Sequence, residues 1–204
     1  MRYNCGKYKI AVAIFAGGRS VRMGKPKESL TTGDGRTFLE RICDEAEACT
    51  QTCICGKYLS VRRGQEADID GFTTVEDDYD DIGPLGGLIP GLRRVKEDGM
   101  DAVLAVAVDM VKYDRYEIEG ICSAYSGEDI LLPRTSDGRA HPLAGIYSVK
   151  IIKRALMNAK EGKYRMTDLQ GEDVRTGYYD TPSDAAYINI NRPQDLSAVL
   201  YNIP

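Results

Sequence analysis

Two short apolar runs, residues 9–15 and 102–108, limit most strongly what this chain can fold into. Neither run alternates apolar with polar residues, and both are far shorter than the roughly 20 apolar residues of a membrane helix. Continuous apolar runs of this length are typical of strands that are buried on both faces of a parallel sheet. We therefore expect both runs to be buried parallel strands.

The rest of the chain alternates between helix and strand patterns. Thr37 and Glu40 match a capping box, which predicts a helix from Thr37 to about Cys49. Pro90 should kink or shorten the helix that opens near Gly83. Further strands are expected at residues 52–55, 72–75, 129–132 and 143–147, a turn at 136–139, and helices at 83–95, 116–125, 149–160 and from Pro193.

This alternation predicts an α/β fold in three layers, with a mostly parallel sheet covered by helices on both faces. The sequence contains no internal repeat, low-complexity tract or Pro/Ser-rich linker. We therefore expect a single domain over residues 1–204.

Composition and charge exclude several classes of protein. The chain has 204 residues and 43% hydrophobic residues, which is enough to fill one core. Its 27 Lys and Arg residues against 31 Asp and Glu give a net charge of -4, so no global positive field is available to hold DNA or RNA. With a polar start and no membrane-spanning run, we expect a cytoplasmic protein that binds neither nucleic acid nor membrane.

The cysteines include one crowded group, namely Cys43, Cys49, Cys53 and Cys55. Their spacing lacks the paired C-x-x-C pattern of a structural zinc site. We expect reduced, small buried side chains here, because a chain with a core of this size does not need disulfides.

The most informative segment, residues 16–27, directly follows the first apolar run. It combines glycines with cations: Gly17, Gly18 and Gly24 with Arg19, Arg22, Lys25 and Lys27. A nucleotide triphosphate requires close backbone approach, free N–H donors and positive charge. The segment is not a Walker A loop, because Pro26 stands where that motif needs a hydroxyl, and it lacks the G-x-G-x-x-G pattern. A phosphate-binding loop is our hypothesis, and an ordinary surface turn is the alternative.

The run Phe15-Ala-Gly-Gly-Arg-Ser-Val-Arg-Met-Gly24, followed by Lys27, resembles the L-A-G-G-x-S-x-R-M-G-x-x-K signature of the MobA-like NTP transferases. Segments 83–87, 141–145 and 189–196 agree in order and spacing with the molybdenum cofactor guanylyltransferase branch of that family. The resemblance implies a Rossmann-like fold of the nucleotide-diphospho-sugar transferase type. It also implies a set of nucleotide contacts, namely Phe15, Ala16, Gly17, Gly18, Arg19, Arg22, Gly24, Lys27, Asp77, Gly83, Pro84 and Leu85.

Two carboxylates are candidates for the chemistry. Asp109 directly follows the second apolar run, and ligands of open α/β sheets collect at the carboxyl ends of strands. A carboxylate there suits Mg²⁺, and the resemblance assigns the catalytic magnesium to Asp109; a cap on the next helix is the alternative. The resemblance also implies that Asp77 lies near the nucleotide, whereas a solvated acidic loop over residues 76–81 is the competing interpretation.

The resemblance further implies an acceptor side of the cleft with four candidate residues, namely His141, Asn189, Asn191 and Arg192. A packed histidine, and asparagines that act only as turn and cap residues, are the alternatives.

The function implied by the resemblance is transfer of GMP from Mg-GTP to molybdopterin or its molybdenum-loaded form, with release of pyrophosphate. Phosphoryl transfer depends mainly on positioning and charge neutralisation, so Arg22, Lys27 and Asp109 are the catalytic candidates. Transient contact with other molybdenum cofactor proteins is implied as well. The alternatives are a cytidylyltransferase or sugar-1-phosphate nucleotidyltransferase on the same fold, and a nucleotide-binding regulatory protein without turnover.

Overall fold

The computed structural model describes residues 7–18, 27–49, 54–79, 81–190 and 195. The strands are β1 Ile10–Phe15, β2 Ile54–Val61, β3 Thr73–Glu76, β4 Ala102–Ala107, β5 Ile130–Arg134, β6 Ile146–Ser148 and β7 Thr176–Asp180. The α-helices are α1 Phe38–Ala48, α2 Pro84–Glu97, α3 Arg115–Ala124 and α4 Ile152–Lys160. Short 3-10 helices are η1 Lys27–Ser29, η2 Pro142–Ala144, η3 Val149–Ile151, η4 Met166–Leu169 and η5 Asp184–Tyr187. The helix expected from Pro193 lies outside the described residues.

The strands form one seven-stranded sheet in the order β3-β2-β1-β4-β6-β5-β7. Strands β1 to β4 are parallel to one another, and β5 is parallel to β7. Strand β6 runs antiparallel to both of its neighbours, β4 and β5. The expectation of a mostly parallel sheet is therefore confirmed, and the carboxyl ends of β1 to β4 lie at one edge.

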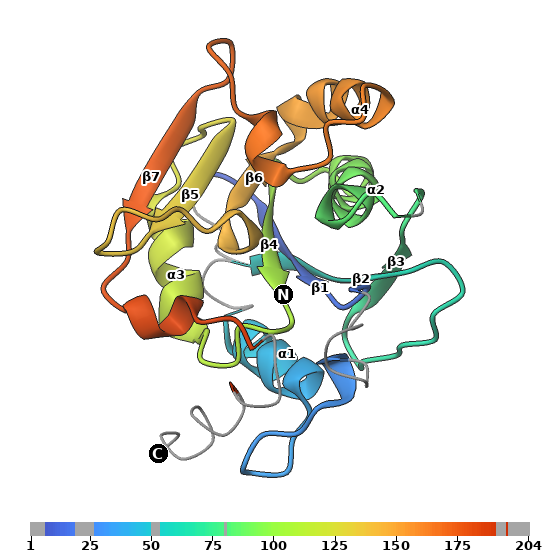
Figure 1. Cartoon of the computed structure of the whole chain (residues 1–204), viewed down its shortest axis with the longest axis vertical. Coiled ribbons are helices and arrows are strands. Elements are labelled where there is room, and N and C mark those ends of the chain that lie inside the picture. Colours follow the sequence, from blue (N-terminus) through green and yellow to red (C-terminus); the bar gives the residue numbers. More distant parts are fainter. Residues whose placement is uncertain (1–6, 19–26, 50–53, 80, 191–194, 196–204) are drawn as a thin grey trace.

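Helices cover both faces of this sheet (Figure 1). Strand β1 shows why, because its residues alternate between two cores. Ile10, Val12 and Ile14 pack with α1 and α3, whereas Ala11 and Ala13 pack with α2 and α4. A strand that is apolar at every position can bury both of its faces only between two layers of helices.

Helix α1 begins as the sequence predicts. The Thr37 hydroxyl accepts a hydrogen bond from the Glu40 amide at 3.1 Å, and the Thr37 amide donates to Glu40 Oε2 at 2.7 Å. These two bonds are the capping box, and the helix ends at Ala48.

Strand β2 differs from the prediction. The strand expected at residues 52–55 ends too early, because β2 continues from Ile54 to Val61. Residues 52–53 lie outside the described residues. Gly56 and Lys57 interrupt the apolar pattern, and long-range contacts explain both residues. A Cβ at Gly56 would lie 2.7 Å from Met100 Cε, and the Lys57 amine pairs with Glu47 of α1.

Of the two effects expected of Pro90, a kink or a shortening of the helix, the shortening does not occur. Helix α2 continues from Pro84 to Glu97 with Pro90 in its interior. Leu85, Leu88 and Leu92 are fully buried along it. Burial contributes about 1.5–3 kcal/mol per large apolar side chain, which together outweighs the roughly 3 kcal/mol cost of an interior proline.

The second half of the chain contains two further differences. Strand β6 does not begin at residue 143, since residues 142–144 form η2 and the Tyr147 hydroxyl donates to the Pro142 carbonyl at 2.7 Å. Strand β7 was not expected, because it is an edge strand that is half exposed and lacks a buried apolar run.

The cysteines also differ in part from the expectation of reduced thiols. Cys43, Cys49 and Cys122 are buried thiols outside any disulfide, whereas Cys55 is disulfide-bonded. A large core removes the need for a disulfide, yet it does not prevent two cysteines that lie close together from pairing.

None of the described helices combines the length and the apolar character that a membrane span requires.

Candidate functional site

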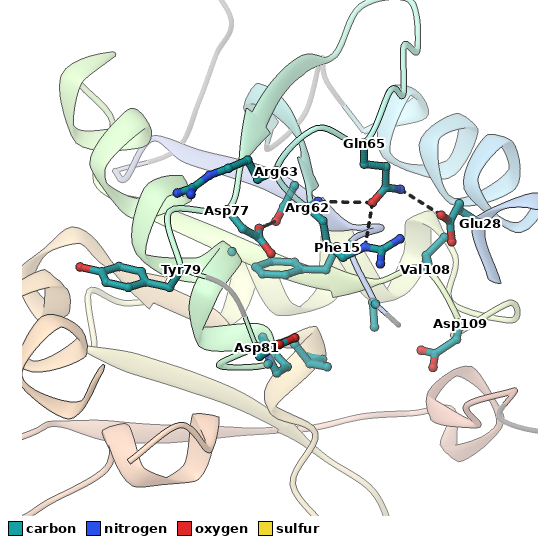
Figure 2. Close-up of a pocket in the computed structure, with 18 of the residues that line it drawn as sticks. Phe15, Glu28, Arg62, Arg63, Gln65, Asp77, Tyr79, Asp81, Val108 and Asp109 are labelled. Carbon is teal, nitrogen blue, oxygen red and sulfur yellow. Dashed lines mark hydrogen bonds between the residues drawn. The ribbon is translucent and has the colours of Figure 1, made fainter. Parts of the chain in front are cut away.

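A cleft of about 740 Å³ opens at the carboxyl ends of β1 to β4 (Figure 2). We call it the main cleft. Its wall is formed by the ends of these strands, the loops that follow them and the first turn of α2. The residues that line it are Phe15, Gly17, Gly18, Glu28, Ser60, Arg62, Arg63, Gly64, Gln65, Asp77, Tyr79, Asp81, Gly83, Pro84, Gly87, Ala107, Val108, Asp109 and Leu143.

Strand register brings the floor of this cleft together. Phe15 pairs with Ser60 of β2 on one side and with Ala107 of β4 on the other. The Ala16 amide donates to the Ser60 carbonyl at 2.9 Å, and the Asp77 amide donates to the Val61 carbonyl at 2.8 Å. The loops that follow four parallel strands therefore start side by side.

Gly17 allows the first loop to approach β2 closely. A Cβ at this position would lie 3.0 Å from the Arg62 amide nitrogen and 3.2 Å from Arg62 Cγ. Any side chain would therefore push the turn away from the end of β2. The glycine turn keeps backbone, rather than side chains, at the edge of the cleft, as a phosphate-binding loop needs.

Asp77 lies beneath the first turn of α2. Its Oδ1 accepts a hydrogen bond from the Ser60 hydroxyl at 3.2 Å. A Cβ at Gly87 would lie 2.2 Å from Ser60 Oγ, 2.8 Å from Phe15 Cε1 and 3.1 Å from Asp77 Oδ1. The second glycine of the Gly86-Gly87 pair therefore lets α2 pack directly on the polar floor of the cleft.

The amino end of α2 also faces the main cleft. Gly83 is the N-cap residue of α2, with φ 62° and ψ -150°, a backbone conformation that residues other than glycine rarely adopt. Pro84 occupies the first helical position. The positive end of the helix dipole thus faces the main cleft and favours an anion there.

Asp109 lies two residues beyond the end of β4, half-buried on the wall of the main cleft. Its carbonyl accepts a hydrogen bond from the Ile190 amide at 3.0 Å, which fixes the turn. The alternative that Asp109 caps the next helix is wrong, because Asp114 accepts the hydrogen bonds from Tyr116 and Glu117 at the start of α3.

A second cavity of about 300 Å³ adjoins the main cleft. Pro84 and Leu143 line both spaces, so the two are separated only by the first turn of α2 and by η2. The other residues that line the second cavity are Met110, Arg139, Ala140, His141, Pro142, Arg165, Met166, Thr167 and Asn189.

His141 is held on two sides within the second cavity. Its Nε2 lies 3.1 Å from the Thr135 hydroxyl, and its ring centroid lies 4.8 Å from that of Tyr187. Burial and the nearby Arg139 guanidinium lower the pKa of His141 below its usual value, partly opposed by Asp137 and Asp184. The imidazole is therefore neutral at neutral pH.

This state of His141 can be measured, because the chain contains a single histidine. An NMR titration of the imidazole should give a pKa below about 6.5, and Arg139→Gln should raise it. The unfolded chain takes up this proton more readily than the folded one, so stability should fall as the pH drops below about 6.5. A titration midpoint above the ordinary value would contradict this description.

The predicted residues divide into four groups: those that line the main cleft, those that line the second cavity, those that line neither, and those outside the described residues. Phe15, Gly17, Gly18, Asp77, Gly83, Pro84 and Asp109 line the main cleft, and His141 and Asn189 line the second cavity. Ala16 and Leu85 are buried in the core, which leaves only their backbone for a ligand, and Lys27 begins η1. Arg19, Arg22, Gly24, Asn191 and Arg192, together with the side chain of Lys27, lie outside the described residues.

The carboxyl end of β2 and the β2–β3 loop were not predicted as parts of the site. Ser60, Arg62, Arg63 and Gln65 all line the main cleft. The signal was the true end of β2, since polar residues directly after a parallel strand mark the ligand edge of the sheet. Ending the strand at Cys55 placed these residues far from any strand end.

The fold and the cleft define an α/β protein with its ligand site at the carboxyl edge of a parallel sheet, the arrangement of nucleotide-binding α/β folds. Molybdopterin-guanine dinucleotide biosynthesis protein A from Archaeoglobus fulgidus has this fold, with a TM-score of 0.73, 18% identity and coverage of 94% of this chain and 97% of that chain. Rv0371c from Mycobacterium tuberculosis, solved in complex with manganese, matches with a TM-score of 0.67, 18% identity and coverage of 96% and 100%.

The sequence comparison then gives the family. The chain belongs to the MobA-like NTP transferase family, whose domain model matches residues 12–174. It is therefore a nucleotidyltransferase by family. A probable molybdenum cofactor guanylyltransferase from Methanosarcina mazei is 26% identical over 92% of this chain and 88% of the relative.

Proposed function

We propose that this protein transfers GMP from Mg-GTP to molybdopterin, releasing pyrophosphate and forming molybdopterin guanine dinucleotide. One observation carries the proposal. The glycine turn, Asp77 and Asp109 share one cleft, and that cleft adjoins a second cavity lined by His141 and Asn189. Two substrates held in adjoining spaces can meet at the boundary formed by Pro84 and Leu143.

The main cleft is the site we propose for the nucleotide. Asp77 offers carboxylate oxygens to the N1–H and N2–H groups of guanine, and Ser60 holds that carboxylate in place. The triphosphate then extends along the Gly17–Gly18 turn toward Asp109. Backbone N–H groups of the turn bind its oxygens, and the positive end of the α2 dipole favours their negative charge.

The donor set of the cleft fits a magnesium ion. Mg²⁺ is usually held by one or two carboxylates together with substrate phosphates and water, and Asp109 provides a half-buried carboxylate on the cleft wall. When bound, Mg²⁺ neutralises charge on the triphosphate and on the departing pyrophosphate.

The second cavity is the site we propose for molybdopterin, including its molybdenum-loaded form. Arg139 and Arg165 line it and suit an anionic acceptor. A phosphate oxygen of the acceptor attacks the α-phosphorus of GTP, and the bond between that phosphorus and the bridging oxygen of the β-phosphate breaks. The attacking phosphate is already ionised at neutral pH, so no general base is needed. Catalysis by the chain then consists of positioning and charge neutralisation, with Arg22 and Lys27 as the further cations we propose.

The proposal is tested by measuring pyrophosphate release with molybdopterin and each of the four magnesium nucleotides. We expect turnover with GTP at least about 10-fold faster than with CTP. Cytosine does not offer the Asp77 carboxylate the paired N–H donors that guanine does, so the carboxylate would be covered by the base without its hydrogen bonds. Faster turnover with CTP would instead assign a cytidylyltransferase. Binding of GTP without release of pyrophosphate would assign a regulatory protein.

A further inference from the structure

Arg62 is the first residue after β2 and lines the main cleft. It belongs to the β2–β3 loop and is therefore separate from the cations of the glycine-rich segment at residues 16–27. The backbone and side chain of Arg62 lie against the glycine turn, since a Cβ at Gly17 would be 3.0 Å from its amide nitrogen and 3.2 Å from its Cγ.

Gln65 fixes the Arg62 side chain in this position. Gln65 Oε1 accepts from the Arg62 amide at 3.3 Å and from Arg62 Nε at 3.4 Å. Gln65 Nε2 in turn donates to Glu28 Oε1 at 2.9 Å and to the Ala16 carbonyl at 3.4 Å. One amide thus ties the β2–β3 loop to the first loop and to η1. Because Gln65 binds Nε, a ligand would bind the two terminal Nη groups of the guanidinium.

Figure 2 shows how Arg62 and its neighbour differ. The Arg62 side chain extends between Phe15 and Val108, over the side of the cleft that carries Glu28, whereas the Arg63 side chain points the other way. Arg63 Nη2 donates to the Asp78 carbonyl at 2.9 Å, outside the glycine turn. Two consecutive arginines therefore have different surroundings, and only the first lies against Gly17.

The charge of the main cleft explains why a cation is needed at this position. Among the described residues that line it, Glu28, Asp77, Asp81 and Asp109 are acidic, against two arginines. A triphosphate beside these carboxylates would meet repulsion unless cations lie at the phosphate oxygens. A guanidinium is suited to this position because its planar fork binds phosphate oxygens in a bidentate way.

We propose that Arg62 binds the triphosphate of the nucleotide beside the Gly17–Gly18 turn, and that Gln65 orients its guanidinium. The inference rests on the proposed function, since it assumes a magnesium nucleotide in the main cleft. It adds a phosphate-binding residue from the β2–β3 loop to those of the glycine loop.

The test compares Arg62→Gln and Arg62→Lys with the control Arg94→Gln, because Arg94 pairs with Asp98 at the end of α2 and lines neither cavity. Affinity for Mg-GTP is measured by calorimetry, and affinity for guanosine, which lacks phosphate, by NMR titration. Arg62→Gln should weaken Mg-GTP binding roughly 10- to 100-fold, which is the loss of affinity expected when hydrogen bonds to a charged group are removed. The same variant should change guanosine binding less than about twofold. Arg62→Lys should recover part of the loss, and Arg94→Gln should leave both affinities within about twofold of the wild type.

Two results would overturn the inference. One is wild-type affinity of Arg62→Gln for Mg-GTP, and the other is an equal loss of guanosine binding, which would indicate damage to the cleft rather than to a phosphate contact. A wild-type chain that binds no magnesium nucleotide would instead refute the proposed function. If the wild type prefers another nucleotide, the same comparison is made with that nucleotide and its nucleoside, so base choice and the Arg62 contact are tested separately.

Discussion

Asp109→Asn is expected to reduce metal-dependent pyrophosphate release by at least about 100-fold, the scale seen when one preorganised charge-stabilising group is lost. The substitution is nearly isosteric and lies on the cleft wall beyond the end of β4, so the packing of the sheet should not change. Steady-state turnover with Mg-GTP and molybdopterin measures the loss, and thermal unfolding measures the fold.

Asp114→Asn provides the matched control for this prediction. Asp114 lies five positions along the chain, where its side chain caps α3, and asparagine caps a helix as well as aspartate does. This control should keep wild-type turnover and stability. Wild-type turnover in Asp109→Asn would show that Asp109 does not bind the catalytic metal ion.

Gly87→Ala is expected to cause the second large effect, on stability and nucleotide binding together. The added methyl would lie 2.2 Å from Ser60 Oγ and 2.8 Å from Phe15 Cε1, so either α2 or the floor of the main cleft must move. Overpacking of this kind costs about 1–3 kcal/mol, and the displaced Ser60 is the residue that holds Asp77. Urea unfolding and calorimetry with Mg-GTP should therefore both report losses.

Gly91→Ala, in the same helix, separates this close contact from helix propensity. Apart from its chain neighbours and the nearby backbone of α2 itself, no heavy atom of the described residues lies within 4 Å of a Cβ at Gly91. Alanine is better than glycine in a helix by about 1 kcal/mol, so this control should be neutral or slightly stabilising. Unfolding of both variants at the same urea concentration would contradict the claim that α2 needs a glycine at position 87 to pack on the floor of the cleft.

The central strands and the first helix could be predicted from the sequence because their signals are local. The continuous apolar runs gave β1 and β4, and the capping box of Thr37 and Glu40 gave α1. Placing Asp109 at the carboxyl end of a buried strand was sufficient to predict where in the sheet it would lie. Parallel strands then bring it to the same cleft as the glycine turn.

The features that could not be predicted depend on contacts between distant segments. In the sequence, Gly56 and Lys57 indicate the end of a strand. They lie within β2 because Met100 packs against Gly56 and Glu47 pairs with Lys57. Ending β2 too early hid Arg62, which lies at the strand's true carboxyl end. Pro90 is tolerated for a similar reason, since tertiary burial of α2 outweighs a local rule.

The central claim is that a triphosphate lies between the glycine turn after β1 and a metal ion on Asp109. It is tested most directly by a crystal structure with a non-hydrolysable GTP analogue and Mn²⁺, whose anomalous signal locates the metal. We predict an anomalous peak within coordination distance of an Asp109 carboxylate oxygen, phosphates along Gly17 and Gly18, and guanine at Asp77. A metal peak away from Asp109, or a nucleotide bound outside the main cleft, would contradict the account.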